Sequence, residues 1–174
     1  MFLWYAIKMP KIKIVHFLFL LVFSYKVVSV LDGDTFSATD GNVTFRVRIA
    51  AMDAPERQQA YGKMAKYRLE ALLKSQHVTI TPVGKGHDKY GRVLGHVFLN
   101  GEDISLQMIQ EGLATYYRPS CHDYPEDKKK YDYNPQKYVE AEQMARSKGK
   151  NIWSAPRSVL PCKFRRAESG RIGF

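Results

Sequence analysis

Alternating and valine-rich apolar runs predict short β-strands over the first hundred residues. These runs lie at 25–31, 36–39, 43–51, 77–83 and 92–99. Asp40-Gly41-Asn42 separates the second run from the third and is typical of a hairpin turn. Residues 84–91 combine glycine with charged side chains, so we expect a loop before the last strand.

Apolar residues at helical spacing predict three helices, at 58–75, 104–111 and 136–148. The second and third are followed by Gly112 and Gly149, which are typical of helix ends. Residues 119–135 are polar and rich in tyrosine, and we interpret them as a loop or a disordered insertion. Three strands, a helix, two strands and two helices predict an α+β, mainly β fold: a five-stranded OB-type barrel with three helices.

Residues 1–24 differ from the rest of the chain. Lys8, Lys11 and Lys13 precede a run of apolar residues over 14–23, which is the pattern of a signal peptide. We therefore expect export to the periplasm or out of the cell, with 25–156 forming one domain and 157–174 a basic tail. Residues 2–7 are apolar too, so an uncleaved segment that tethers the protein to a membrane is the alternative.

Charge and cysteine content narrow the class of partner and the compartment. The formal net charge is +10 and the pI about 9.6, which favours polyanions such as nucleic acid. The chain has two cysteines, Cys121 and Cys162, and export would permit a disulfide between them. Two free thiols are the alternative, and no Cys/His spacing typical of structural zinc occurs.

Two acidic motifs allow both a structural and a chemical interpretation. Asp32-Gly33-Asp34-Thr35, taken alone, is most typical of a plain turn. Asp53-Ala54-Pro55-Glu56, taken alone, favours a helix start, with Asp53 as N-cap and Glu56 three residues later. A carboxylate at the end of a strand can also face a metal ion, so each motif is a candidate source of hard oxygen ligands.

Two arginine positions could supply bidentate contacts to phosphate. Arg48 lies five residues before Asp53, and on a regular strand this odd offset puts the two side chains on opposite faces. A bend or bulge at Ala50-Ala51 would bring them together; otherwise Arg46 is the competing candidate. Asp88-Lys89-Tyr90-Gly91-Arg92 is most simply interpreted as a solvated loop. In the functional interpretation, the Arg92 side chain binds a phosphate group of the substrate.

Taken in order, these motifs and Asn151-Ile152-Trp153-Ser154 resemble the staphylococcal nuclease (thermonuclease) family over residues 27–154. The resemblance implies an OB-type barrel with three helices. It also implies a calcium-dependent phosphodiesterase that acts on DNA and RNA and leaves 3′-phosphate ends.

The resemblance assigns metal binding and proton transfer to the two acidic motifs. Asp34 and Asp53 match the Ca²⁺ ligands, together with the backbone carbonyl of Ala54. Many relatives have threonine at position 54, and a carbonyl ligand tolerates that change. Glu56 matches the residue proposed as general base, and Asp32 matches an acid close to the metal.

The resemblance assigns the remaining functional positions to substrate. Arg48 and Arg92 match the two transition-state arginines, and Lys89, Tyr90 and Tyr117 match nucleotide-binding positions. The chain departs from the family at Thr115, where the type member has a nucleotide-contacting tyrosine. Either Tyr116 substitutes there or that contact is missing.

The main alternative is an OB-type module that binds single-stranded nucleic acid without cutting it. Retention of the five key side chains favours the enzyme: Asp34, Arg48, Asp53, Glu56 and Arg92. Tyrosines interleaved with lysines in the later loops suit base stacking, and packing of these tyrosines on the barrel is the alternative. We expect single strands to be the preferred substrate. Nothing in the sequence demands more than a monomer.

Overall fold

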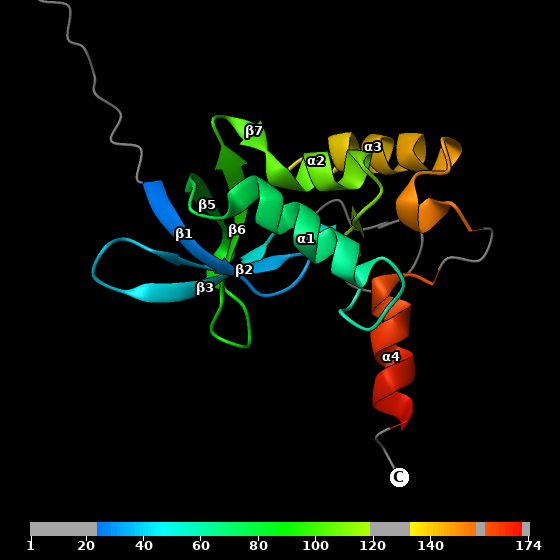
Figure 1. Cartoon of the computed structure of the whole chain (residues 1–174), viewed down its shortest axis with the longest axis horizontal. Coiled ribbons are helices and arrows are strands. Elements are labelled where there is room, and N and C mark those ends of the chain that lie inside the picture. The colour runs from blue at the N-terminus through cyan, green and yellow to red at the C-terminus, as the bar shows by residue number, and fades with distance from the viewer. Residues whose placement is uncertain (1–23, 119–132, 156–158, 172–174) are drawn as a thin grey trace, which may run out of the picture.

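The structure is a computed structural model that describes residues 24–118, 133–155 and 159–171 (Figure 1). The predicted signal segment, Cys121 and most of the predicted tyrosine-rich insertion lie outside these residues. The described elements are β1 Ser24–Val30, β2 Thr35–Thr39, β3 Thr44–Ile49, β4 Met52–Asp53, α1 Gly62–Leu73, β5 His77–His87, β6 Val93–Leu99, β7 Glu102–Asp103, α2 Ile104–Gln110, β8 Thr115–Tyr116, α3 Gln136–Ser147, the 3₁₀ turn η2 Asn151–Trp153 and α4 Pro161–Arg171.

Five strands close into the predicted barrel. The sheet order is β3-β2-β1-β5-β6-β7, and an additional pairing of β3 with β6 joins the two sides. The β3–β6 pairing is parallel, with Arg48 opposite Leu94, whereas the others in the barrel are antiparallel. The barrel therefore combines one parallel strand pairing with antiparallel ones. Its interior is filled by apolar side chains that alternate along the strands, including Phe36, Val47 and Val97.

The helix α1 lies across the barrel, and α2 and α3 pack side by side next to it (Figure 1). The sequence predicted a helix over 58–75, and the motif at 53–56, taken alone, favoured Asp53 as an N-cap. Both differ from the structure: α1 begins at Gly62, after Tyr61 in a left-handed conformation with φ +67°. A Cβ on Gly62 would lie 1.9 Å from the carbonyl oxygen of Glu56, so only glycine allows the chain to turn there. Asp53 is thereby left free of a capping role.

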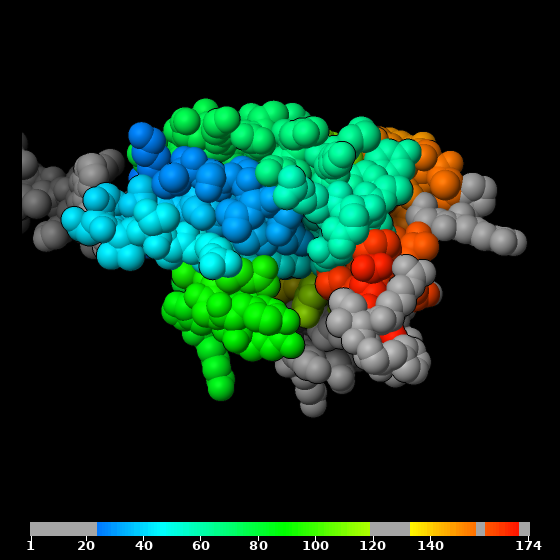
Figure 2. Space-filling view, turned by 60° about the horizontal axis from the view of Figure 1, so that its bottom comes forward, coloured from blue at the N-terminus to red at the C-terminus, as the bar shows by residue number. Residues whose placement is uncertain are grey.

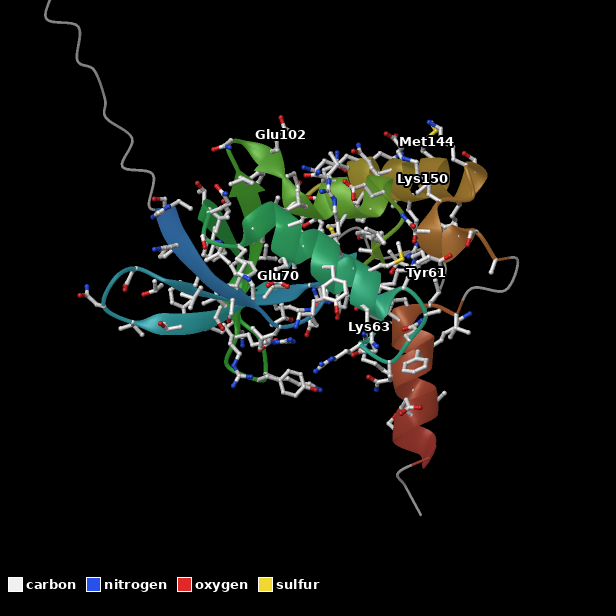
Figure 3. All side chains as sticks on the ribbon, in the orientation of Figure 1. Tyr61, Lys63, Glu70, Glu102, Met144 and Lys150 are labelled. Carbon is white, nitrogen blue, oxygen red and sulfur yellow. The ribbon has the colours of Figure 1, made fainter. Side chains whose placement is uncertain are left out.

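Polar contacts join the helices to neighbouring segments of the chain. Arg118, at the end of the segment that follows β8, forms a buried ion pair with Glu142 of α3. Tyr61 donates or accepts a hydrogen bond of 2.8 Å with the Ser154 hydroxyl, which ties the start of α1 to the segment after η2 (Figure 3). The start of α1 is therefore tied to a segment 93 residues later in the chain.

The segment predicted as a basic tail contains a further helix. Residues 161–171 form α4, and Leu160 just before it is buried. Cys162 in the first turn of α4 is disulfide-bonded. Within the described part of the chain, no helix is long and apolar enough to cross a membrane.

Candidate active site

The loop between β1 and β2 presents Asp34 at the mouth of the barrel. Its backbone N–H donates to Asp32 Oδ1 at 3.0 Å, which closes a local turn. A Cβ on Gly33 would lie 2.6 Å from the Cβ of Ala54 and 2.8 Å from that of Ala65. The glycine is therefore needed for close packing of this loop against the β4–α1 segment and α1, and the predicted plain turn is only part of its role.

A corner between β3 and β4 brings Arg48 and Asp53 together. Ala51 has φ +62°, a conformation that residues with a side chain seldom adopt. Its carbonyl accepts from the Tyr117 N–H at 3.0 Å, and β4 then pairs with β8. The bend expected at Ala50-Ala51 is present and moves Asp53 to the same side as Arg48.

Arg48 lies between the two predicted metal-binding carboxylates. Its Nη2 is 3.1 Å from Asp34 Oδ2 and 3.2 Å from Asp53 Oδ1. Its Nη1 donates to the carbonyls of Ile49 and Met52, at 2.6 and 3.0 Å. These main-chain contacts fix the guanidinium in place. Arg46, two residues earlier on β3, is exposed, so the structure places Arg48 rather than Arg46 at the carboxylates.

Arg92, in the segment between β5 and β6, contacts the same site. Its Nε donates to Asp88 Oδ2 at 2.7 Å, and its Nη1 donates to the Thr35 hydroxyl at 3.2 Å. That hydroxyl in turn donates to Asp34 Oδ1 at 3.0 Å. A continuous series of polar contacts therefore joins Arg92, Thr35, Asp34, Arg48 and Asp53, which come from three separated stretches of sequence.

Burial raises the pKa of two carboxyl groups at this site. Burial is the largest influence on Asp53 and raises its pKa, although ion pairs with Arg165 and Arg48 pull it back down. Burial, then the charge of Asp34, raises the pKa of Asp32 to about 6. The charge of Asp34 raises the pKa of both neighbouring carboxyl groups, so a cation bound among the three would favour their ionised form.

The donor set suits a hard cation. Among the residues that the structure describes, no group of three or more His, Cys, Asp or Glu side chains is arranged to hold a metal ion. Asp34 and Asp53 nevertheless both reach one nitrogen of Arg48, so their oxygens can reach one small cation. Cations such as Ca²⁺ take carboxylate, main-chain carbonyl and water ligands together. The N–H of Ala54 donates to Asp34 Oδ2 at 3.0 Å and keeps residue 54 beside these carboxylates.

Glu56 lies at the rim of the site, with its side chain 36% exposed. Its backbone N–H donates to Gln59 Oε1 at 3.2 Å, and its carbonyl accepts from the Gln59 N–H at 2.8 Å. The turn that precedes α1 therefore holds Glu56 in position. Its carboxylate is partly exposed to solvent, and its Oε1 accepts from Arg165 Nη1 at 2.8 Å.

The predicted nucleotide-binding side chains flank the arginines. Tyr90 is 72% exposed, with Lys89 Nζ 5.0 Å and Arg92 Cζ 5.4 Å from the centre of its ring. The ring of Tyr117 is 6.0 Å from Arg48 Cζ. Tyr116 is buried against Tyr138 and does not face the site, so it does not substitute for the tyrosine missing at 115.

A family model described as "Staphylococcal nuclease homologue" matches residues 46–155. The chain belongs to this family. The sequence is also similar to three named proteins. An "uncharacterized endonuclease" of Haemophilus influenzae is 33% identical over 150 residues, which cover 86% of this chain and 76% of the relative. "Micrococcal nuclease" of Shigella flexneri is 38% identical over 154 residues, 83% and 82% of the two chains. "Thermonuclease" of Staphylococcus hyicus is 32% identical over 139 residues, 75% and 76%.

Two residues at this staphylococcal nuclease-type site have no role in the prediction from sequence. Thr35 joins Arg92 to Asp34, and its position next to Asp34 in the first acidic motif could have indicated this contact. Arg165 of α4 contacts Asp53 and Glu56 from 112 and 109 residues away in sequence. No local pattern distinguishes Arg165 from the other basic residues of the tail.

Proposed function

We propose that this chain is a calcium-dependent endonuclease that hydrolyses phosphodiester bonds in DNA and RNA, prefers single strands and leaves 3′-phosphate ends. The observation that carries the proposal is the position of the Arg48 guanidinium within 3.1 and 3.2 Å of the buried carboxylates of Asp34 and Asp53. Membership of the staphylococcal nuclease family and relatives named as nucleases support hydrolysis of nucleic acid.

The acidic residues have two separate roles, in binding the cation and in accepting a proton. Asp34, Asp53 and the carbonyl of Ala54 would hold Ca²⁺, which supplies a positive charge that polarises the scissile phosphate. Glu56 accepts the proton from the attacking water, because its carboxylate is solvent-accessible and lies on the same side as Asp53. Thr35 orients Asp34 by donating to Oδ1, which leaves Oδ2 directed at Arg48.

Arg48 and Arg92 stabilise the charge that develops on the phosphoryl oxygens. Arg48 is held by two main-chain carbonyls and Arg92 by Asp88, so neither side chain has to reorganise as the charge appears. Fixed donors in a partly buried site are worth more than the same donors in water. Arg92 reaches Asp34 Oδ1 through the Thr35 hydroxyl, whereas Arg48 contacts Asp34 Oδ2, which suits contact with different oxygens of one phosphate.

The exposed aromatic and basic side chains position the substrate. The Tyr90 ring is largely exposed, with the cationic groups of Lys89 and Arg92 over it, and Tyr117 lies beside Arg48. Stacking needs a base whose face is open, so this arrangement favours single strands or locally opened duplexes. Because every base has such a face, we expect little dependence on sequence.

We also propose that the protein acts as an exported monomer, in the periplasm or outside the cell. The basic apolar N-terminal segment supports export, and the disulfide at Cys162 is of the kind that persists in oxidising compartments. Cell fractionation tests this proposal: a soluble chain shortened by about 24 residues is expected. A full-length chain in the membrane fraction would instead support a tethered form.

Digestion of denatured DNA and RNA with Ca²⁺ or with EGTA tests the activity. The wild-type protein should cut both in Ca²⁺ and neither in EGTA, and the DNA 3′ ends should be extended by a polymerase only after phosphatase treatment. Asp53→Asn should remove the activity, while Asp40→Asn, in the exposed β2–β3 turn, should retain it. Calcium-independent retention of single-stranded DNA without any product would favour the binding module instead.

A further inference from the structure

The helix α4 inserts a guanidinium into the site described above. Arg165 Nη1 is 3.0 Å from Asp53 Oδ1, and its Nη2 is 2.9 Å from Asp53 Oδ2. The same Nη1 is 2.8 Å from Glu56 Oε1. One side chain therefore forms a two-pronged ion pair with a predicted metal ligand and a third contact with the predicted base.

These contacts use the oxygens that a cation would need. Asp53 is almost fully buried, and both of its carboxylate oxygens already accept from arginine: Oδ2 from Arg165, and Oδ1 from Arg165 and Arg48. A divalent cation bound to Asp53 competes with these donors for the carboxylate oxygens, and its charge repels the nearby guanidinium groups. Arg48 is secured by main-chain carbonyls and only 12% exposed, whereas Arg165 is 42% exposed and comes from a peripheral helix. Arg165 is the group that can leave.

The position of α4 is supported by other contacts. Gln59 Nε2 donates to the Val159 carbonyl at 2.6 Å, and the same Gln59 holds the backbone of Glu56. Leu160 is buried, and Cys162 is disulfide-bonded. Figure 2 shows the start of α4, in red, directly against the segment that leads into α1. The helix is therefore anchored three to six residues before Arg165, and its side chain stays close to Asp53 and Glu56.

We propose that Arg165 is an internal competitor for the metal ion: it neutralises Asp53 and Glu56 in the metal-free protein and is displaced when a divalent cation binds. The helix α4 is thus an inhibitory segment that lowers the affinity of the site for the cation and engages the base until the cation arrives. This inference rests on the proposed calcium site. It differs from a role in substrate binding, in which Arg165 would help rather than oppose activity.

Calorimetric titration of the full chain with Ca²⁺ alone, without substrate, tests the competition. Arg165→Gln should bind Ca²⁺ about tenfold more tightly than wild type, because a charge-assisted pair no longer has to be broken. Arg165→Lys should lie between the two, since an ammonium cannot form the two-pronged contact. Lys163→Gln, which removes the same charge from an exposed position of α4, should bind within about twofold of wild type. The Ca²⁺ concentration that gives half-maximal cleavage should shift in parallel.

The possible outcomes separate the two proposals. Equal Ca²⁺ affinity of wild type and Arg165→Gln, with wild-type binding clearly measured, would overturn the competition and leave the proposed function intact. Equal affinity with a lower kcat/KM at saturating Ca²⁺ would make Arg165 a substrate contact and would overturn the competition too. Absence of Ca²⁺ binding by every variant would contradict the calcium site itself, and the inference would fail with it. Circular dichroism establishes that the variants are folded.

Discussion

Asp53 Oδ1 lies 3.2 Å from Arg48 Nη2, although the two residues are separated by an odd number of positions on consecutive strands. A regular strand would point the two side chains to opposite faces. The left-handed conformation of Ala51, with φ +62°, reverses this relationship at a single residue. The unusual backbone conformation of Ala51 therefore allows the contact between Arg48 and Asp53 on which the proposed chemistry depends.

Arg48→Ala should lower kcat/KM for single-stranded DNA by about 10²–10³, because it removes a preorganised donor to the transition state. Arg46→Ala is the matched control, since Arg46 lies on the same strand but is exposed. Its activity should stay within a few-fold of wild type, with any loss reduced by added salt.

Arg48→Ala removes a positive charge that lies beside Asp34 and Asp53, so its folding has to be checked, together with that of the Arg46→Ala control. Far-ultraviolet circular dichroism in the presence of Ca²⁺ provides this check. Folded Arg48→Ala protein with wild-type kcat/KM would rule out the assigned role of this residue.

Gly33→Ala should destabilise the protein by about 1–3 kcal/mol, the usual cost of overpacking. Its new Cβ would lie 2.6 Å from the Cβ of Ala54 and 2.8 Å from that of Ala65, so the Asp34 loop must move away. We also expect weaker Ca²⁺ binding, since Asp34 is next to the displaced residue. Gly170→Ala in α4 meets no atom within 4 Å and should be neutral or slightly stabilising. Urea unfolding compares the two, and equal midpoints would contradict the packing role of Gly33.

The sequence predicted much of the fold because the strands and three of the helices have clear periodicity. Alternating runs gave the five barrel strands, and Gly112 and Gly149 marked two helix ends close to their positions in the structure. The start of α1 was missed because a helix-start pattern at Asp53 competed with tertiary contacts. Those contacts place Asp53 between two arginines and require Gly62 to pass close to the carbonyl of Glu56.

The site could be predicted only in part. Local motifs named the carboxylates and arginines, and the family resemblance chose between Arg48 and Arg46. The α4 contribution was missed because Arg165 reaches Asp53 across 112 positions, and long-range placement leaves no periodic signal in the chain. The parallel β3–β6 pairing was missed for the same reason, since it joins strands from opposite ends of the barrel sheet.

Tyr90→Ala should raise KM for single-stranded DNA by the equivalent of about 1–3 kcal/mol of binding free energy, the usual loss for one stacked base. Its ring is 72% exposed and lies between Lys89 and Arg92, so its truncation leaves the barrel intact. Tyr67→Ala is the control, because Tyr67 is 64% exposed on α1. Steady-state kinetics separates KM from kcat, and equal KM values for the two variants would exclude stacking on Tyr90.

The stability of the protein in acid should depend on Asp103, which joins α2 to α3 away from the active site. Its Oδ1 accepts from the Leu106 N–H at 3.2 Å, and its Oδ2 accepts from Lys137 Nζ at 2.7 Å and the Tyr138 hydroxyl at 2.8 Å. Burial alone would raise the pKa of Asp103, but these hydrogen bonds outweigh it and hold the pKa below its ordinary value of 3.8.

A carboxyl group whose pKa is lower in the folded than in the unfolded state stabilises the fold above the unfolded pKa. That stability is lost as the pH falls from about 4 through the folded pKa, because the unfolded chain then binds the proton more readily.

Asp103→Asn cannot titrate, so it should be about 1–3 kcal/mol less stable than wild type at pH 7. The difference should shrink as the pH falls below about 4. Urea unfolding from pH 7 to pH 3 measures it, with Glu102→Gln at the exposed neighbouring position as control. A gap between Asp103→Asn and wild type that is independent of pH would show that these hydrogen bonds do not depress the pKa of Asp103.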